Sequence, residues 1–437
     1  MAKAKKGKLT IEDAIVPVEE QPYEIPENWC WTYLLSGAAE CKDGFRKPIN
    51  SSERADREGD IPYYGATGQV GWIDDYLTDE QLVLLGEDGA PFLDLMKDKA
   101  YMIEGKAWVN NHAHILKSYY GEIGNKYLLH YLNTFNYHGF VNGTTRLKLT
   151  QASMNTIPVP IPPLAEQQRI VEQIENMFAK LDEAKEKAQE SLDGFQTRID
   201  SILHKAFSGD LSVVWRNENG ISSVRENVIF RDILDVRDGT HDSPQYYDEG
   251  YPLVTSKNLK NGCITDKDIK YISKEDFDQI NQRSKVDVGD ILFAMIGTIG
   301  NPVVIEDEPN YAIKNVALFK NKGKVNPYFI KYYLESREVR DKMQKEAKGT
   351  TQKFVSLGYL RDFPIAIPSD LEQEYIVKKL DELLSKELQA VSIIEEVIEQ
   401  IDLMKKSVLA KAFRGELGTN ESEDESSIEL LKSILEK

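Results

Sequence analysis

Residues 157–211 read IPVPIPPLAEQQRIVEQIENMFAKLDEAKEKAQESLDGFQTRIDSILHKAFSGDL, and residues 363–417 read FPIAIPSDLEQEYIVKKLDELLSKELQAVSIIEEVIEQIDLMKKSVLAKAFRGEL. The two stretches align without a gap, since every matching pair, such as Glu166 and Glu372, is 206 positions apart. A repeat of this length has to be recognised first, because it determines how the whole chain is divided. Only two long copies are present, so the sequence predicts a duplicated half-molecule and not a solenoid.

Each copy has the pattern of one long amphipathic helix. Apolar residues recur at alternating steps of three and four, which is the spacing of one helical face. In the first copy these residues are Ile170, Ile174, Met177, Leu181, Ala184, Ala188, Leu192, Phe195, Ile199, Ile202 and Ala206. The four-residue step at Leu192 is a stutter that locally unwinds a supercoil, and Gly209 and Gly415 suit left-handed C-caps. We expect the two helices to pack as an antiparallel coiled coil that acts as a ruler. Two unrelated helices in separate domains are the alternative.

The composition indicates a globular protein of two or three domains. The chain has 437 residues, and no apolar run approaches the length that a membrane helix needs. The N-terminus lacks the apolar segment of a secretory signal. Three widely spaced cysteines, Cys30, Cys41 and Cys263, predict reduced thiols of a cytoplasmic protein without a metal cluster. The net charge of −18 taken alone argues against nucleic-acid binding, but much of the acid lies in the two helices and the C-terminal tail.

Two regions of mixed helix and strand pattern alternate with the long helices. The predicted divisions are an N-terminal arm at 1–20, a first mixed domain at 21–150, a first long helix at 151–212, a second mixed domain at 213–356, a second long helix at 357–418 and an acidic tail at 419–437. The predicted class is α+β: two mixed α/β domains separated by two long helices packed as an antiparallel coiled coil, with pseudo-two-fold duplication. The arm is either a frayed terminus or a segment that binds a partner or DNA.

The two mixed regions match weakly but in the same order, and each closes on a similar turn. These turns are Gly143-Thr-Thr-Arg and Gly349-Thr-Thr-Gln, again 206 positions apart. The helical copies are therefore much more alike than the domains between them. This contrast predicts two modules that do the same kind of work on different targets.

Motifs of catalysis and metal binding are missing or incomplete. The chain has no GxxxxGK[ST] phosphate loop and no GxGxxG after a strand. The segment Asp242-Ser-Pro-Gln-Tyr faintly resembles an amino-methyltransferase motif, but it lacks the second proline and a glycine-rich cofactor loop. His112 and His114 share one face of a strand without a third ligand in sight. We therefore predict no catalytic residue and no metal ligand, and we interpret the chain as a binding protein.

Loop residues that could meet DNA occur in both mixed domains. Cationic, amide and hydroxyl groups contact phosphates and base edges, although any one of them could be an ordinary solvated residue. In the first domain the candidates are Arg46, Lys47, Arg54, Tyr64, Thr67, Gln69, Asn111, Thr144, Thr145 and Arg146. In the second they are Arg237, Thr240, His241, Tyr246, Ser256, Lys257, Asn258, Lys314, Asn315, Thr350, Thr351 and Lys353. The glycine–threonine turns suit phosphate binding, or they simply join a helix to a strand.

From Tyr23 to Leu417 the chain resembles the DNA specificity subunit of type I restriction–modification systems. The residues that carry the resemblance are Ile25-Pro-Glu-Asn-Trp-Cys-Trp, Asp238-Gly-Thr-His-Asp-Ser-Pro, Thr255-Ser-Lys-Asn, Gly289-Asp-Ile-Leu-Phe, Gly297-Thr-Ile-Gly, Ile313-Lys-Asn-Val-Ala-Leu-Phe and the starts of both long helices. The resemblance implies two target-recognition domains, each reading half of a split site in double-stranded DNA. It also implies a non-catalytic scaffold for two methyltransferase subunits, which methylate adenine at N6, and for two restriction/translocase subunits where these are present.

The same resemblance places the cofactors elsewhere: S-adenosylmethionine, ATP and Mg²⁺ are implied for the partner subunits and none for this chain. The first domain departs from the pattern, because Gly86-Glu-Asp-Gly stands where the second has Ala294-Met-Ile-Gly. The acidic pair disfavours a phosphate contact there, although Glu87 could accept from a cytosine amino group. We expect Glu166 and Glu372 to lie on a partner-binding surface. A coiled-coil adaptor without a DNA role and a degenerate methyltransferase or nuclease are the alternatives.

Overall fold

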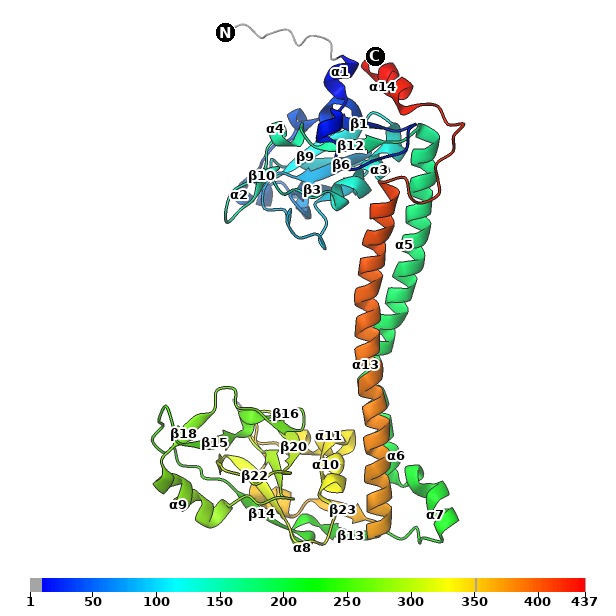
Figure 1. The fold of residues 1–437 in the computed structure, drawn as a ribbon. Coiled ribbons are helices and arrows are strands. Elements are labelled where there is room, and N and C mark those ends of the chain that lie inside the picture. Colours follow the sequence, from blue (N-terminus) through cyan, green and yellow to red (C-terminus); the bar gives the residue numbers. More distant parts are fainter. Residues whose placement is uncertain (1–9, 350–351, 437) are drawn as a thin grey trace. The chain divides into compact units, whose positions relative to one another are not determined.

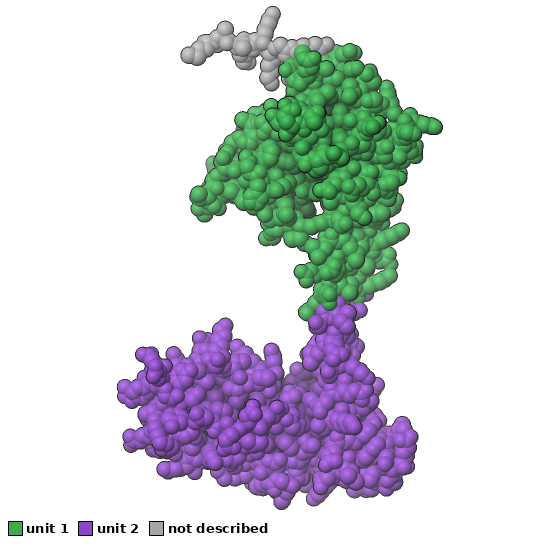
Figure 2. All heavy atoms as spheres, in the orientation of Figure 1, with its two compact units in different colours: residues 1–189, 395–437 green, residues 190–394 purple. Residues whose placement is uncertain are grey.

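The computed structural model describes residues 10–349 and 352–436 (Figure 1). The chain divides into two compact units: unit 1 comprises Met1–Gln189 and Glu395–Lys437, and unit 2 comprises Glu190–Ile394 (Figure 2). Each unit combines one mixed α/β domain with part of the long helices. The predicted α+β class and the duplicated organisation are confirmed. The predicted divisions gave each helical stretch a segment of its own, whereas both long helical stretches contribute residues to both units.

The mixed domain of unit 1 contains two four-stranded sheets, ordered β2–β9–β6–β7 and β4–β3–β8–β5. Strand β6 is buried along its whole length because it is the apolar run Leu82-Val-Leu-Leu-Gly. Helix α3 packs against β6, β7 and β9. The elements are β2 (Ala39–Cys41), α2 (Ser51–Ala55), β3 (Ile61–Gly65), β4 (Gly68–Ile73), β5 (Thr78–Asp79), β6 (Leu82–Gly86), β7 (Ala100–Ile103), β8 (Lys106–Val109), β9 (Ala113–Ser118), α3 (Gly121–Thr134), β10 (Val141–Asn142), β11 (Lys148–Leu149) and α4 (Gln151–Met154).

The mixed domain of unit 2 has a four-stranded sheet, β14–β22–β19–β20, and a three-stranded sheet, β18–β15–β21. Helix α10 packs against β20, and α9 packs against β21. The elements are α7 (Val213–Asn219), α8 (Phe230–Ile233), β14 (Leu234–Asp238), β15 (Tyr251–Thr255), β16 (Leu259–Lys260), β17 (Cys263–Ile264), β18 (Lys270–Ile272), α9 (Lys274–Ser284), β19 (Ile291–Ala294), β20 (Gly300–Val304), β21 (Ala312–Lys314), β22 (Val316–Asn321), α10 (Pro327–Glu335), α11 (Arg337–Glu346) and α12 (Leu357–Arg361).

A short antiparallel pair in each unit ties the start of the mixed domain to the strand that precedes a long helix. In unit 1, β1 (Cys30–Tyr33) pairs with β12 (Pro158–Ile161). In unit 2, β13 (Glu226–Ile229) pairs with β23 (Pro364–Ile367). The same connection therefore recurs in both halves, as the repeat predicts.

The long helices are α5 (Leu164–Asp193), α6 (Phe195–Ser208) and α13 (Asp370–Ala412). The break at Gly194 lies two residues after the predicted stutter. In unit 1, Lys185 of α5 pairs with Asp402 of α13 at 2.6 Å, and in unit 2, Arg198 of α6 pairs with Glu387 at 2.8 Å. Within unit 1 alone, Asp182 of α5 also pairs with Lys405 of α13. Residue numbers therefore rise on one helix as they fall on the other, and the antiparallel coiled coil is confirmed.

A buried glutamate begins each long helix. The side chains of Glu166 and Glu372 are both 0% exposed. Glu166 accepts hydrogen bonds from the Trp29 indole N–H at 2.7 Å, from Asn420 at 2.8 Å and from Thr419 at 3.2 Å. Because these groups close over its carboxylate, Glu166 is not available to a partner subunit. The expectation that the two glutamates lie on a partner-binding surface is wrong.

Glu372 occupies the corresponding position in unit 2 but faces cations. It accepts from Ser212 at 2.7 Å, Arg216 at 2.6 Å and Arg225 at 3.1 Å. Burial raises the pKa of Glu372, but the hydrogen bonds from these three side chains outweigh it and hold the pKa below its ordinary value. The segment that follows the first long helix is thereby fixed to the start of the second.

Both ends of the described chain fold onto unit 1. The hydroxyl of Thr32 donates to the carbonyl of Ala14, which ends α1 (Ile11–Ala14). Helix α14 (Ser427–Leu435) buries Leu431 in the core of unit 1, and the Ser427 N–H donates to Asn28 at 3.0 Å. Residues 1–9 of the predicted arm lie outside the described residues. Within the described chain, no helix is both long and apolar enough to cross a membrane.

The two glutamates predict unequal costs of substitution. We expect Glu372→Gln to destabilise unit 2 by about 3–5 kcal/mol, because Arg216 and Arg225 lose their buried countercharge. Glu166→Gln loses hydrogen bonds from neutral donors, so unit 1 should lose only about 1–3 kcal/mol. Hydrogen exchange measured separately in each unit checks both values, with the exposed Glu172→Gln as control. Equal losses in the two units would contradict the assignment.

The same contacts give a pH dependence. Since the pKa of folded Glu372 is lowered, its contribution is fully present above the pKa of an ordinary glutamate, about 4.3. This contribution is lost as the pH falls through the lower folded pKa. Exchange in unit 2 should therefore rise on acidification in the wild type and change less in Glu372→Gln. An identical pH response in the two proteins would contradict the assignment of this pH dependence to Glu372.

Candidate nucleic-acid interface

A parallel strand pair in each mixed domain brings polar loops to one edge. In unit 1, β3 pairs with β8, and in unit 2, β15 pairs with β21. The carboxyl ends of two parallel strands lie at the same edge of a sheet, so the residues that follow them are neighbours. Asn110 and Asn111 follow β8, and Asn315 follows Lys314, the last residue of β21. We call these places the polar edge of unit 1 and the polar edge of unit 2.

Backbone hydrogen bonds assemble the polar edge of unit 2 from three segments. The N–H of Thr240 donates to Ile313 at 3.0 Å, and the N–H of Asn315 donates to Thr240 at 3.1 Å. The hydroxyl of Ser256 donates to the carbonyl of Asn315 at 2.9 Å. Lys314 is largely buried and its ammonium bonds to the Ser243 hydroxyl. Predicted residues that are 59 or more positions apart in the sequence are thus brought together.

His241 links a buried acid to an amide at this edge. Its Nε2 lies 2.9 Å from Asp238 Oδ2, and its Nδ1 lies 2.8 Å from Asn315 Oδ1. The hydrogen bond with Asn315 raises the pKa of His241, burial opposes this, and the contact with Asp238 raises it further. Asp238 is 5% exposed and also accepts from Arg283.

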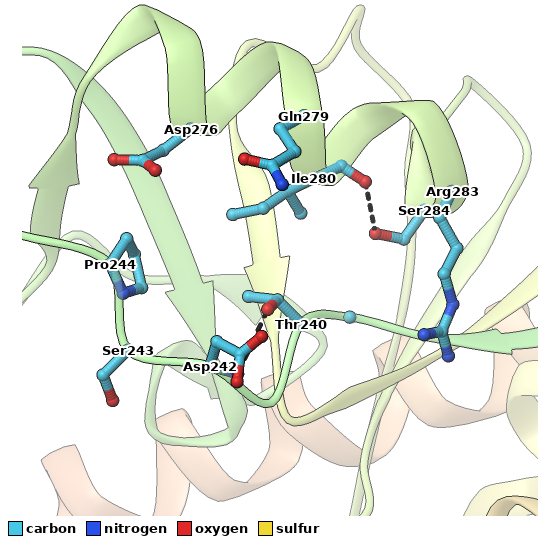
Figure 3. A pocket seen from close by; sticks show the side chains of 10 residues that line it. Thr240, Asp242, Ser243, Pro244, Asp276, Gln279, Ile280, Arg283 and Ser284 are labelled. Atoms are coloured by element: carbon cyan, nitrogen blue, oxygen red, sulfur yellow. Dashed lines mark hydrogen bonds between the residues drawn. The ribbon is translucent and has the colours of Figure 1, made fainter.

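A hollow of about 240 Å³ lies beside this edge (Figure 3). The loop with Thr240 and Asp242 forms one wall, and helix α9 with Asp276, Gln279 and Arg283 forms the other. The N–H of Asp242 donates to the Thr240 hydroxyl at 3.2 Å, which holds the loop in its turn. Polar groups of both signs line the hollow, so it suits a hydrogen-bonding partner better than an apolar one.

The polar edge of unit 1 carries exposed amide and hydroxyl groups. The side chains of Thr67, Gln69 and Asn111 are exposed, and the N–H of Asn110 donates to Tyr64 at 3.0 Å. Arg54 lies over the ring of Tyr63 at 4.9 Å, which fixes its position by a cation–π contact. Tyr64 also pairs with Gln69 across β3 and β4, so the backbone of Tyr64 joins the segments that carry Gln69 and Asn111.

Arg46 is not exposed in the same way, because it forms ion pairs with carboxylates of unit 1. Arg46 pairs with Glu87 and with Asp43, and Lys148 pairs with Glu87 at 2.9 Å. His114, only 1% exposed, lies 2.7 Å from Asp43. Burial raises the pKa of Glu87, but the hydrogen bonds from Lys148 and Arg46 outweigh it and keep the pKa low. Neither Arg46 for phosphate nor Glu87 for cytosine is free in this arrangement.

Three members of the cluster also have the spacing of metal ligands. Donor atoms of Asp43, Glu87 and His114 lie within 4.8 Å of one another. A cation bound there would have to displace Arg46 and Lys148, which already neutralise the two carboxylates. The cluster is therefore adequately explained as a set of buried ion pairs that joins β9 to the loops of unit 1.

The threonine turns are described in only one of the two units. Thr144, Thr145 and Arg146 are exposed, and Arg146 pairs with Asp88 at 2.9 Å. Thr350 and Thr351 lie outside the described residues. The neighbouring Lys353 is exposed, and its carbonyl accepts from the Gly297 N–H at 2.9 Å.

The other candidates differ in their availability. Tyr246 is 44% exposed, and Lys47 and Lys257 are also exposed. Arg237 pairs with Asp235 at 2.6 Å. Asn258 is buried, and its amide bonds to the backbone of Thr255, Thr265 and Lys267, so it shapes the loop and offers nothing to DNA.

Sequence reasoning missed Asp238 and Arg283 as functional residues. In the sequence Asp238 stands out only as the first residue of the motif Asp238-Gly-Thr-His-Asp-Ser-Pro. Arg283 lies on α9, whose pattern gives no sign that it meets the β14 loop. Only Asp238 could have been predicted from the sequence, because a carboxylate three positions before His241 can pair with it.

The comparisons with known proteins agree with this architecture. The family model described as the type I restriction modification DNA specificity domain matches residues 33–192 and 226–400, more than half of the chain. A protein of Haemophilus influenzae whose name places it among type I restriction enzyme specificity subunits is 29% identical over 79% of this chain and 86% of its own length. The EcoKI specificity subunit of Escherichia coli is 27% identical over 61% of this chain and 59% of its own length.

Two solved structures share the fold. One, from a study of complex assembly in the type I R-M system, has a TM-score of 0.65 and 16% identity over 91% of this chain and 100% of its own. The other, the HsdS subunit of Thermoanaerobacter tengcongensis, has a TM-score of 0.60 and 16% identity over 92% of this chain and 100% of its own. The family match covers both mixed domains and most of the helical residues. The chain therefore belongs to the DNA specificity subunits of type I restriction–modification systems, which recognise DNA and do not themselves catalyse a reaction.

Proposed function

We propose that this chain reads a bipartite site in double-stranded DNA, with the polar edge of each unit contacting one half. The observation that carries the proposal is the recurrence of one construction with different side chains. Corresponding parallel pairs, β3–β8 and β15–β21, end in different polar loops. Two domains that share a backbone arrangement but carry different side chains at their polar edges can each recognise a different half-site.

The groups at the two edges have the chemistry of base readout. Asn, Gln and Lys side chains match donors and acceptors in the major groove, while hydroxyls and backbone N–H groups position the phosphates. Gln69 and Asn111 represent the first kind in unit 1, and Lys257 and Asn315 in unit 2. Two of the candidates, Arg46 and Asn258, are not assigned to DNA contacts, because they bind other residues of the same unit.

We further propose that the chain assembles in the cytoplasm with two methyltransferase subunits and with two restriction/translocase subunits where these occur. S-adenosylmethionine, ATP and Mg²⁺ would then be bound by those partners. The long helices support this role, since they offer a large surface in addition to the polar edges. The E. coli and H. influenzae relatives carry names that assign them to restriction enzymes.

Sequencing the methylated adenines made by the assembled complex tests the proposal. We expect two fixed half-sites separated by an unspecified spacer. Asn111→Ala should relax one position of one half-site, costing about 1–3 kcal/mol of discrimination there, and leave the other half-site unchanged. The buried Asn258→Ala is unsuitable as a control because it would disturb its loop, so the exposed helical Glu172→Gln is used. Changes in both half-sites at once would oppose separate reading.

The charge of the chain generates a second expectation. A net charge of −18 opposes a polyanion, so the free chain should bind duplex DNA more weakly than the complex with methyltransferase subunits. Fluorescence anisotropy with the cognate duplex, at several salt concentrations, compares the two. Equal affinity of the free chain and the complex at the same salt would refute the expectation that the free chain binds more weakly.

The helix pair generates a third expectation, that its length sets the spacer. Four residues inserted after Ala188, with four more after Glu399 on the facing helix, would lengthen the pair by about 6 Å. DNA advances about 3.4 Å per base pair, so the spacer should grow by one or two base pairs while both half-sites stay the same. Methylome sequencing reads the result directly. An active variant with the original spacer would exclude the ruler.

A further inference from the structure

The imidazole of His241 is held between two oxygen atoms. Nε2 faces Asp238 Oδ2 and Nδ1 faces Asn315 Oδ1. An oxygen of either kind can only accept, so both ring nitrogens carry protons in this arrangement. The charged groups that face the ring are Asp238 of β14 and Arg283 of α9, and Arg283 shares the carboxylate of Asp238. The raised pKa of His241 agrees with an imidazolium.

This contact determines how the amide of Asn315 is oriented. Its oxygen is turned toward the imidazolium, and its NH₂ group, which only donates, is turned away. The backbone is fixed as well, because Asn315 has a left-handed φ of 55° and its carbonyl accepts from Ser256. Asn is one of the few residues that tolerate this conformation. The amide is therefore preorganised and cannot turn freely.

The orientation has a consequence for base readout. A free Asn contacts adenine with both groups, accepting from N6 and donating to N7. With its oxygen turned toward the ring, the amide presents only its NH₂ donors outward, and these match the N7 and O6 acceptors of guanine. If His241 loses its proton from Nδ1, that nitrogen becomes an acceptor. The amide can then turn, so that NH₂ faces the ring and the oxygen faces outward.

We propose that Asp238, His241 and Asn315 form a relay in which His241 is a positioning residue that makes Asn315 read guanine instead of adenine. The inference rests on the proposed function, because it needs the polar edge of unit 2 to face base edges. It adds a cause for specificity: the base read by Asn315 is determined by the proton on Nδ1 of His241. Among the described residues of unit 1 neither of the corresponding histidines meets an amide side chain: His112 meets Asp88, and His114 lies between Asp43 and the carbonyl of Leu149.

The test uses the complex of the full chain with its methyltransferase subunits. Two duplexes that differ by guanine or adenine at the position read by Asn315 are methylated in competition. The wild type should prefer guanine by about tenfold or more. His241→Ala frees the amide oxygen and should abolish most of that preference. Asn315→Asp, which only accepts, should reverse it. His204→Ala, which removes an exposed histidine of α6, is the matched control and should leave the preference unchanged.

The pH profile separates positioning from a purely structural role. The wild-type preference should fall as the pH rises through the raised pKa of His241, while His241→Ala should show a pH-independent ratio. Melting curves identify any variant that does not fold. If His241→Ala does not fold, the base preference of Asn315→Asp tests the relay by itself. A methylome without two half-sites would overturn the proposed function. Two normal half-sites with an unchanged base preference in both variants, or a uniform loss on all sequences, would overturn the relay and leave the function standing.

Discussion

Each half of this molecule depends on a buried carboxylate at the start of a long helix. A charge removed from water is costly unless several donors surround it. Glu166 and Glu372 satisfy this condition by binding the segment that leads into the mixed domain of the same unit and the segment that follows the other long helix. In each unit one donor directly precedes the first strand of the domain: Trp29 stands before β1, and Arg225 stands before β13. The carboxylate thus joins helix, domain and following segment at one point.

Glu166 and Glu372 occupy corresponding positions, but the groups that bind their carboxylates differ. Neutral donors close over Glu166, whereas Arg216 and Arg225 neutralise Glu372. The mixed domains differ in the same manner, with ion pairs around Glu87 in unit 1 and the relay of His241 in unit 2. Duplication has preserved the positions that hold each unit together, while the side chains at the polar edges differ. This is the arrangement expected of one scaffold that serves two recognition tasks.

The long helices and the duplication could be predicted because their signals are local and periodic. The steps of three and four in residues 157–211 and the spacing of 206 need no tertiary information. The role of the glutamates could not be predicted, since their partners come from segments up to 254 positions away. Arg46 and Asn258 have the right chemistry for DNA, but packing supplied them with internal partners. Chemistry at loop tips predicts candidates, and only the fold determines which remain available.

Site-specific photo-crosslinking tests the central claim that the two polar edges read separate half-sites. A photoreactive amino acid is placed at the exposed Gln69 of unit 1 or at the exposed Tyr246 of unit 2, and the assembled complex is irradiated on its cognate duplex. The account predicts that each position crosslinks to one half-site only, and that the two positions mark different halves. Crosslinks from both positions to the same half-site, or from neither position to the fixed bases, would contradict it.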